Sequence, residues 1–135
     1  MIATQLDRVR GEFEDSEFFR FLGLEITTLE EGDVELRLPY KPELDNVRST
    51  VHGGVYMSVL DTVMGLFIRS LGYDDTMTIQ MQTQFLKPLV GGAMTARAEL
   101  INKTRSTVLL EGRLYNESGE LIGHATGTFK VMKFD

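Results

Sequence analysis

Residues 55–71 read VYMSVLDTVMGLFIRSL, and the rest of the chain can be understood from this long apolar segment. Its only charged residues are Asp61 and Arg69, and Gly72 follows where glycine commonly ends a helix. A membrane span needs about 20 predominantly apolar residues, so this segment falls short of one. We therefore expect a buried central helix, apolar nearly all round. Such a helix must be covered on all sides, most naturally by a sheet that wraps it.

The sequence after this helix predicts the sheet. Apolar residues or threonines alternate with polar residues over 77–85, and the same alternation continues over 94–100 after a turn at Gly91-Gly92. Residues 108–114 and 121–132 indicate two more strands. Because the connections are short, we expect these four strands to form an antiparallel meander in chain order.

Two further pieces precede the central helix. Residues 2–22 carry apolar side chains at helical spacing, with Ser16 placed as an N-cap and Gly23 as a helix stop. Residues 24–28 and 34–38 alternate as the two strands of a hairpin. The predicted fold class is therefore α+β, an antiparallel sheet wrapped around one long central helix.

Composition narrows the class of function. The chain has 135 residues, the size of the single domain that we expect over residues 1–135. A net charge of −6 argues against a nucleic-acid partner, and 12 of the 20 acidic residues lie within residues 1–45. The absence of cysteine excludes disulfides and thiolate metal sites, and two histidines leave little for a metal centre. The N-terminal residues include charged side chains where a signal peptide would have an apolar segment, so we expect a cytoplasmic protein without a membrane partner.

The residues that could carry chemistry lie around the start of the central helix. Gly53-Gly54 stands where a loop becomes a helix, and free N–H groups there could hold a carbonyl oxygen as it becomes an oxyanion. Asp61 is the only acid between residues 45 and 74, and it lies in the most apolar helix, where an unpartnered carboxylate is costly. Asn46 and His52 bring polar groups to the same place. Taken singly, each of these features also fits a tight turn, a cap or a buried ion pair.

The combination is more specific. Asn46, His52-Gly53-Gly54 and Asp61 at this spacing resemble the hot-dog-fold acyl-CoA thioesterases of the phenylacetate-pathway (PaaI-like) type. Further likenesses are Phe21-Leu22-Gly23-Leu24, Phe85-Leu86-Lys87-Pro88 with Gly91, Gly119, and Gly127-Thr128-Phe129-Lys130-Val131. The resemblance covers nearly the whole chain, and it implies hydrolysis of an acyl-CoA thioester to free acid and CoA.

The resemblance also implies a role for each residue of the motif. Asp61 matches the catalytic carboxylate, acting as general base on water or as nucleophile. Gly53 matches the N–H that polarises the thioester carbonyl, and Asn46 matches a side chain that positions water or substrate. His52 shapes the turn. Thr78 matches a hydroxyl that orients the water, although a one-residue slip of its strand would turn it to the opposite face.

Further residues are expected to bind the substrate. They are Gly54, Tyr56, Met57, Lys103, Arg105 and Ser106. Tyr56 and Met57, with Leu60 and Met64, suggest an adaptable apolar pocket. The basic side chains of Lys103 and Arg105 can bind the CoA phosphates, although the loop over residues 103–106 lacks the glycine that the family often has.

Helix geometry limits the mechanism. Asp61 lies seven residues after Gly54, about 10 Å along the helix axis, so the carboxylate cannot reach a thioester held at its own helix start. Either the helix is not the reaction platform, or the two groups come from different subunits. The resemblance implies the second arrangement: a homodimer with composite active sites, assembled further into a homotetramer. It implies no metal and no cofactor other than CoA as part of the substrate.

Two other functions remain open on the sequence. A hot-dog acyl-thioester hydratase would carry its histidine in a proline-containing loop, whereas His52 is followed by two glycines. A non-catalytic acyl-CoA-binding module would keep the fold and use Asp61 structurally.

Overall fold

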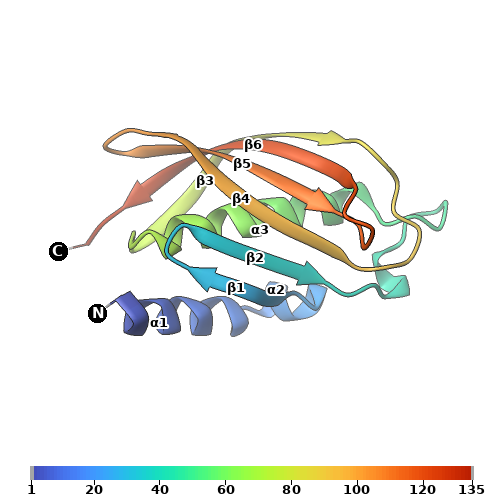
Figure 1. Cartoon of the computed structure of the whole chain (residues 1–135), viewed down its shortest axis with the longest axis horizontal. Helices are drawn as coiled ribbons and strands as arrows, with labels where there is room; N and C mark the ends of the chain where they lie inside the picture. The colour runs from blue at the N-terminus through green and yellow to red at the C-terminus, as the bar shows by residue number, and fades with distance from the viewer. Residues whose placement is uncertain (1, 135) are drawn as a thin grey trace.

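In the computed structural model, which describes residues 2–134, a six-stranded antiparallel sheet curves around one long helix (Figure 1). The elements in chain order are α1 (Ile2–Glu14), α2 (Glu17–Leu22), β1 (Glu25–Glu30), β2 (Asp33–Leu38), a 3-10 turn (Pro42–Leu44), α3 (Gly53–Ser70), β3 (Asp75–Phe85), β4 (Met94–Lys103), β5 (Thr107–Tyr115) and β6 (Leu121–Met132). The predicted fold class, α+β with a sheet around one central helix, is confirmed. None of the helices within residues 2–134 is both long and apolar enough to cross a membrane.

The N-terminal helices end and begin where the sequence predicts. Ser16 caps α2 by accepting a hydrogen bond from the Phe19 N–H, and Gly23 ends it with φ of 88°, in the left-handed region that favours glycine. α1 then packs against both α3 and β1. The helical segment at the N-terminus is therefore held against one flank of the central helix.

The order of the strands differs from the predicted meander. In space the order is β1-β2-β4-β5-β6-β3, so β3 pairs with β6 and not with its successor β4. Gly91 and Gly92 do turn the chain, with φ of 62° and 79°, but residues 86–93 form a crossing connection and not a hairpin. Leu89 is buried and its carbonyl accepts a hydrogen bond from the Val51 N–H, which anchors this connection away from β3. β3 becomes an edge of the sheet.

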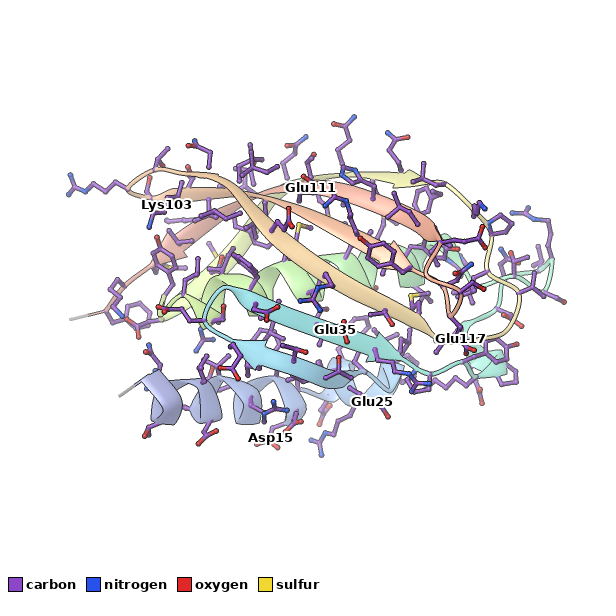
Figure 2. The ribbon with its side chains drawn as sticks, viewed as in Figure 1. Asp15, Glu25, Glu35, Lys103, Glu111 and Glu117 are labelled. Carbon is purple, nitrogen blue, oxygen red and sulfur yellow. The ribbon has the colours of Figure 1, made fainter. Side chains whose placement is uncertain are left out.

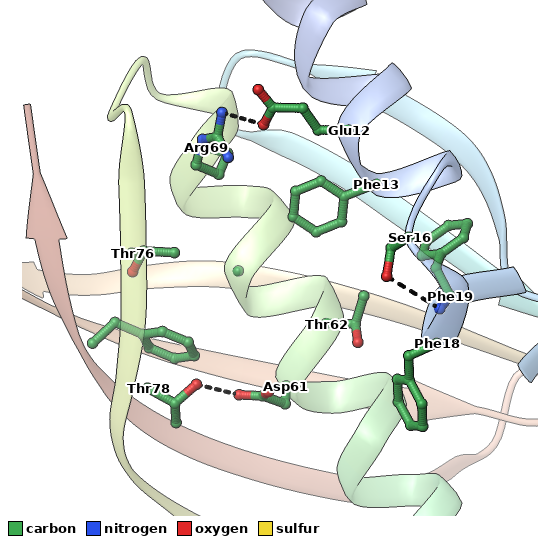
Figure 3. A pocket seen from close by; sticks show the side chains of 12 residues that line it. Glu12, Phe13, Ser16, Phe18, Phe19, Asp61, Thr62, Arg69, Thr76 and Thr78 are labelled. Carbon is green, nitrogen blue, oxygen red and sulfur yellow. Dashed lines mark hydrogen bonds and ion pairs between the residues drawn. The ribbon is translucent and has the colours of Figure 1, made fainter. Parts of the chain in front are cut away.

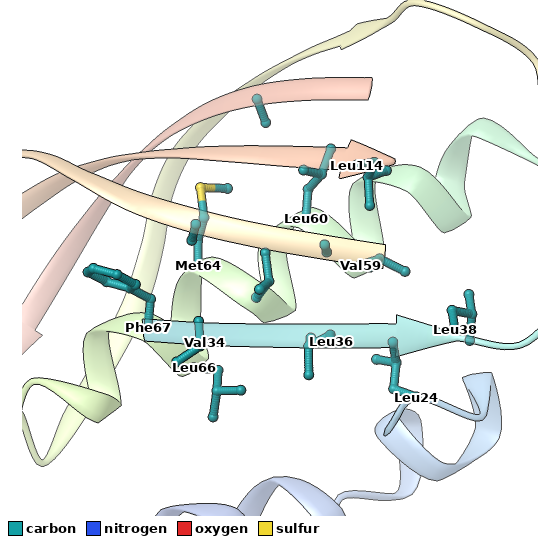
Figure 4. Close-up of a cluster of buried hydrophobic side chains, with 14 of the residues drawn as sticks. Leu24, Val34, Leu36, Leu38, Val59, Leu60, Met64, Leu66, Phe67 and Leu114 are labelled. Atoms are coloured by element: carbon teal, nitrogen blue, oxygen red, sulfur yellow. The ribbon is translucent and has the colours of Figure 1, made fainter. Parts of the chain in front are cut away.

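The core lies between α3 and the concave face of the sheet (Figure 4). Leu60 and Met64 are fully buried there, so they belong to the core and not to the substrate pocket suggested by the sequence. Gly127 of β6 allows this close approach, because a Cβ atom at that position would lie 3.2 Å from the Met64 Sδ and 2.8 Å from a Phe129 ring carbon.

The expectation that α3 is covered on all sides is wrong. Met57 is 41% exposed, and Ser58, Asp61 and Thr62 are only half-buried. Two of these polar side chains bond to their own helix: Ser58 Oγ donates to the Gly54 carbonyl at 2.8 Å, and Thr62 Oγ1 donates to the Ser58 carbonyl at 2.7 Å. These hydroxyls need no hydrogen-bond partner from another element. One face of α3 can therefore remain uncovered by the sheet and line pockets.

Candidate active site

The start of α3 presents a free backbone donor. His52 caps the helix with φ of −61° and ψ of 139°, and its Nδ1 accepts a hydrogen bond from the Gly54 N–H at 2.8 Å. The Gly53 N–H has no acceptor within the part of the chain that the structure describes. Because this N–H lies at the positive end of the helix dipole, it suits an oxygen that gains negative charge.

Asn46 organises the loop that leads to this donor. Its Oδ1 accepts hydrogen bonds from the backbone N–H groups of Arg48 and Thr50, at 2.8 and 3.2 Å, and its Nδ2 donates to the Thr50 Oγ1 at 2.9 Å. Ser49 takes a positive φ of 63° within this turn. The Asn46 side chain is therefore already engaged by its own loop, and it shapes the approach to Gly53.

A pocket of about 250 Å³ lies beside the helix start. It is lined by Asn46, Arg48, Thr50, Val51, Gly53, Tyr56, Phe85, Leu86, Lys87 and Pro88. The Phe85 ring lies so close to Gly53 that a Cβ atom there would meet it at 3.1 Å. Tyr56 is buried, its hydroxyl donates to the Lys87 carbonyl at 2.7 Å, and burial raises the pKa of this hydroxyl above its ordinary value.

Replacing Tyr56 by phenylalanine is expected to lower the free energy of unfolding by about 1 kcal/mol, because the Lys87 carbonyl loses its donor. The raised pKa means that folding favours the neutral hydroxyl, so this stabilisation holds at neutral pH and is lost as pH rises above about 10. Urea unfolding of both proteins across that range measures the effect. A difference that stays constant with pH would contradict the role of the hydroxyl.

Asp61 lies further along α3, and the structure pairs it with Thr78. The Thr78 Oγ1 donates to the Asp61 Oδ1 at 2.7 Å (Figure 3). A regular strand would place Thr78 on the same face as Gln80 and Gln82. The register shifts between Thr78 and Gln80, and this irregularity turns Thr78 toward α3 while Met81 also stays on that side.

The Asp61–Thr78 pair stands between two pockets. One, of about 280 Å³, is lined by Met57, Ser58, Asp61, Thr78 and Met81. The other, of about 360 Å³, lies between the N-terminal helices, α3 and β3 (Figure 3). The carboxylate can therefore face a ligand from either side. No group of three histidine, aspartate or glutamate side chains among residues 2–134 is placed to hold a metal ion.

The structure does not bring all the candidate residues together within one chain. α3 runs unbroken from Gly53 to Ser70, so Gly53 and Asp61 are eight residues or about 12 Å apart along the axis, and they line different pockets. The exposed residues 103–106 lie at the opposite end of the sheet from the loop of Asn46 (Figures 1 and 2).

Sequence patterns identified Asp61 and Thr78, but not the rest of the larger pocket that these two residues line. Phenylalanines of α1, α2 and β6 form much of its wall. They are Phe13, Phe18, Phe19 and Phe129. One local signal in the sequence could have indicated this pocket. Gly65 lies in the middle of α3, where a glycine destabilises the helix and forms no turn.

Comparison with known proteins agrees with this fold. The sequence profile of the Thioesterase superfamily matches residues 49–122. The medium/long-chain acyl-CoA thioesterase YigI of Salmonella typhimurium is 28% identical over 131 residues, which cover 84% of each chain. The structure of the Escherichia coli PaaI protein of the phenylacetic acid degradation operon is 19% identical with a TM-score of 0.88, covering 98% of this chain and 96% of that one.

A solved relative also carries a ligand. The hypothetical thioesterase of Streptococcus pneumoniae, solved with coenzyme A, is 26% identical with a TM-score of 0.78, covering 84% of this chain and 91% of that one. The match to the family profile spans more than half of the 135 residues, and the curved sheet around α3 is the hot-dog architecture. This chain belongs to the thioesterase superfamily and has its hot-dog fold.

Proposed function

We propose that this protein is a PaaI-like acyl-CoA thioesterase that hydrolyses an acyl-CoA to the free acid and CoA. The observation that carries the proposal is the Asp61–Thr78 hydrogen bond beside two pockets, in a chain whose long helix begins with a Gly53 N–H that has no acceptor among residues 2–134. The superfamily membership, the YigI relative and the relative solved with coenzyme A support the same chemistry.

The proposed reaction divides the work between two groups. The Gly53 N–H, aided by the dipole of α3, holds the thioester oxygen as it becomes an oxyanion. Asp61 accepts a proton from a water molecule whose oxygen attacks the carbonyl carbon, and Thr78 orients the carboxylate. The tetrahedral intermediate then collapses, the C–S bond breaks and CoA leaves as a thiolate. A thiolate is a good leaving group, so the reaction needs no strong general acid.

The distance between Gly53 and Asp61 supports composite sites in a homodimer, with Gly53 from one protomer and Asp61 from its partner. The free edge of β3 supports such pairing, because Met77 and Ile79 there are 54% and 58% exposed. We further propose that two dimers form a tetramer and that Lys103 and Arg105 contact the CoA phosphates. Light scattering coupled to size-exclusion chromatography tests the assembly.

The direct test of the function is a free-thiol assay on a panel of acyl-CoAs, including acetyl-, hexanoyl-, decanoyl- and phenylacetyl-CoA. Release of CoA is the expected result. Addition of water across the double bond of an enoyl-CoA, without thiol release, would instead identify a hydratase. Binding of acyl-CoA with neither reaction would identify a non-catalytic module.

A further inference from the structure

The larger pocket runs along α3 away from the Asp61–Thr78 pair (Figure 3). Asp61, Gly65 and Arg69 are four residues apart on one face of the helix, so Gly65 lies about 6 Å and Arg69 about 12 Å beyond Asp61 along the axis. Phe13 and Phe19 face the same space and pack edge to face, with ring centroids 6.5 Å apart. The pocket therefore begins at the proposed catalytic carboxylate and has an aromatic wall, and the polar residues Ser16, Thr62 and Thr76 also line it.

Gly65 keeps this pocket open. Apart from the backbone of its own helix, a Cβ atom at Gly65 would meet nothing within 4 Å among residues 2–134, although Gly65 is itself buried in the middle of an 18-residue helix. Alanine would fit the space and would stabilise the helix, because glycine loses more conformational freedom on folding. The glycine preserves empty volume beside Asp61 at the expense of helix stability.

The far end of the pocket carries a charge pair that is already satisfied. The Arg69 guanidinium bonds the Glu12 carboxylate at 2.6 Å and donates to the Tyr73 carbonyl at 3.0 Å, and the Arg69 side chain is only 11% exposed. Because the charge of Arg69 is already paired, its guanidinium would bind a second carboxylate only weakly. The pocket thus suits a neutral group that stops short of Arg69.

We propose that this pocket holds the acyl part of the substrate and that Gly65 sets the size of the group it accepts. This inference rests on the proposed thioesterase function and deepens it. The substrate class is a neutral acyl group with apolar bulk, such as an aryl-acetyl or medium-chain acyl group, whose thioester carbonyl lies at Asp61. The bulk of the group lies over Gly65 against the rings of Phe13 and Phe19.

The test compares Gly65→Ala and Gly65→Val with Gly11→Ala. Gly11 also lies within a helix, and a Cβ atom there would likewise meet nothing within 4 Å in the described part of the chain beyond its own helix backbone, but Gly11 does not line the pocket. Both alanine variants are expected to raise the Tm by about 2–4 °C. Only the Gly65 variants are expected to lower the ratio of kcat/KM for phenylacetyl-CoA to that for acetyl-CoA, by about tenfold or more for valine.

A binding measurement keeps the inference separate from the proposed hydrolysis. Titration calorimetry measures the affinity of two proteins, Asp61→Asn and Asp61→Asn/Gly65→Val, for phenylacetyl-CoA and for acetyl-CoA. We expect the added valine to weaken the binding of phenylacetyl-CoA and to leave the binding of acetyl-CoA unchanged. If the wild type binds these esters without releasing thiol, the proposed reaction fails while this binding difference still supports the pocket. Unchanged ratios and affinities in the Gly65 variants would overturn the pocket assignment, as would a wild type that binds neither ester.

Discussion

Replacement of Asp61 by asparagine is expected to lower kcat for acyl-CoA hydrolysis by about 10²–10⁴-fold, the range that general base catalysis contributes. Asparagine has nearly the same shape, and its Oδ1 can still accept the hydrogen bond of the Thr78 hydroxyl, which the wild-type carboxylate accepts at 2.7 Å. It cannot take up a proton from water. The loss should therefore fall on turnover and leave the affinity for the substrate largely intact.

The measurement is steady-state thiol release with the best substrate of the panel, together with a thermal unfolding curve. Asp61 is half-buried, so we expect the Tm of Asp61→Asn to stay within a few degrees of the wild type. Asp7→Asn, which neutralises an exposed acid of α1, is the matched control for the change of net charge. Full activity of Asp61→Asn would remove Asp61 from the mechanism.

The second large effect is expected from Gly53→Pro, which removes the N–H proposed to stabilise the oxyanion. Loss of one such donor costs about 10²–10³-fold in kcat. Proline is well tolerated as the first residue of a helix, and His52 already has the extended backbone that a residue before proline requires. The matched variant Gly53→Ala adds a Cβ against the same Phe85 ring but keeps the N–H, so we expect it to lose much less activity.

Combining the two defects tests whether the site is shared between subunits. In a mixed dimer of Asp61→Asn and Gly53→Pro protomers, one composite site has both intact groups and the other has neither. Random exchange between the inactive parents should then restore about a quarter of the wild-type activity. Differently tagged protomers establish that exchange has occurred. Mixed dimers that remain as inactive as their parents would show that Gly53 and Asp61 act within the same subunit, or that they do not belong to one active site.

Much of the local structure follows from short-range signals in the sequence. The cap at Ser16, the stop at Gly23 and the long helix, predicted over residues 55–71 and observed over 53–70, depend on residues within one or two turns of each other. Helix periodicity also predicts that Gly53 and Asp61 are too far apart to act together in one chain, and the unbroken α3 bears out that separation.

The strand order could not be predicted in the same way. Alternation identifies the strands, but it does not identify their neighbours, because pairing depends on where the connecting chain is anchored. Here the buried Leu89 ties residues 86–93 to Val51, and β3 is left to pair with β6. The irregularity next to Thr78 is equally invisible in the alternation, yet it turns this hydroxyl toward Asp61.

By itself, the sequence determined the elements of this protein, the fold class and a candidate carboxylate, because caps, periodicity and a lone acid in an apolar helix are local properties. Only the tertiary structure decided what surrounds that carboxylate. The pocket beside Asp61 joins Phe13, Gly65 and Phe129, which lie more than 50 residues apart in the chain. Contacts at such separations arise from the packing of α1, α3 and β6, and no pattern within a single segment encodes them.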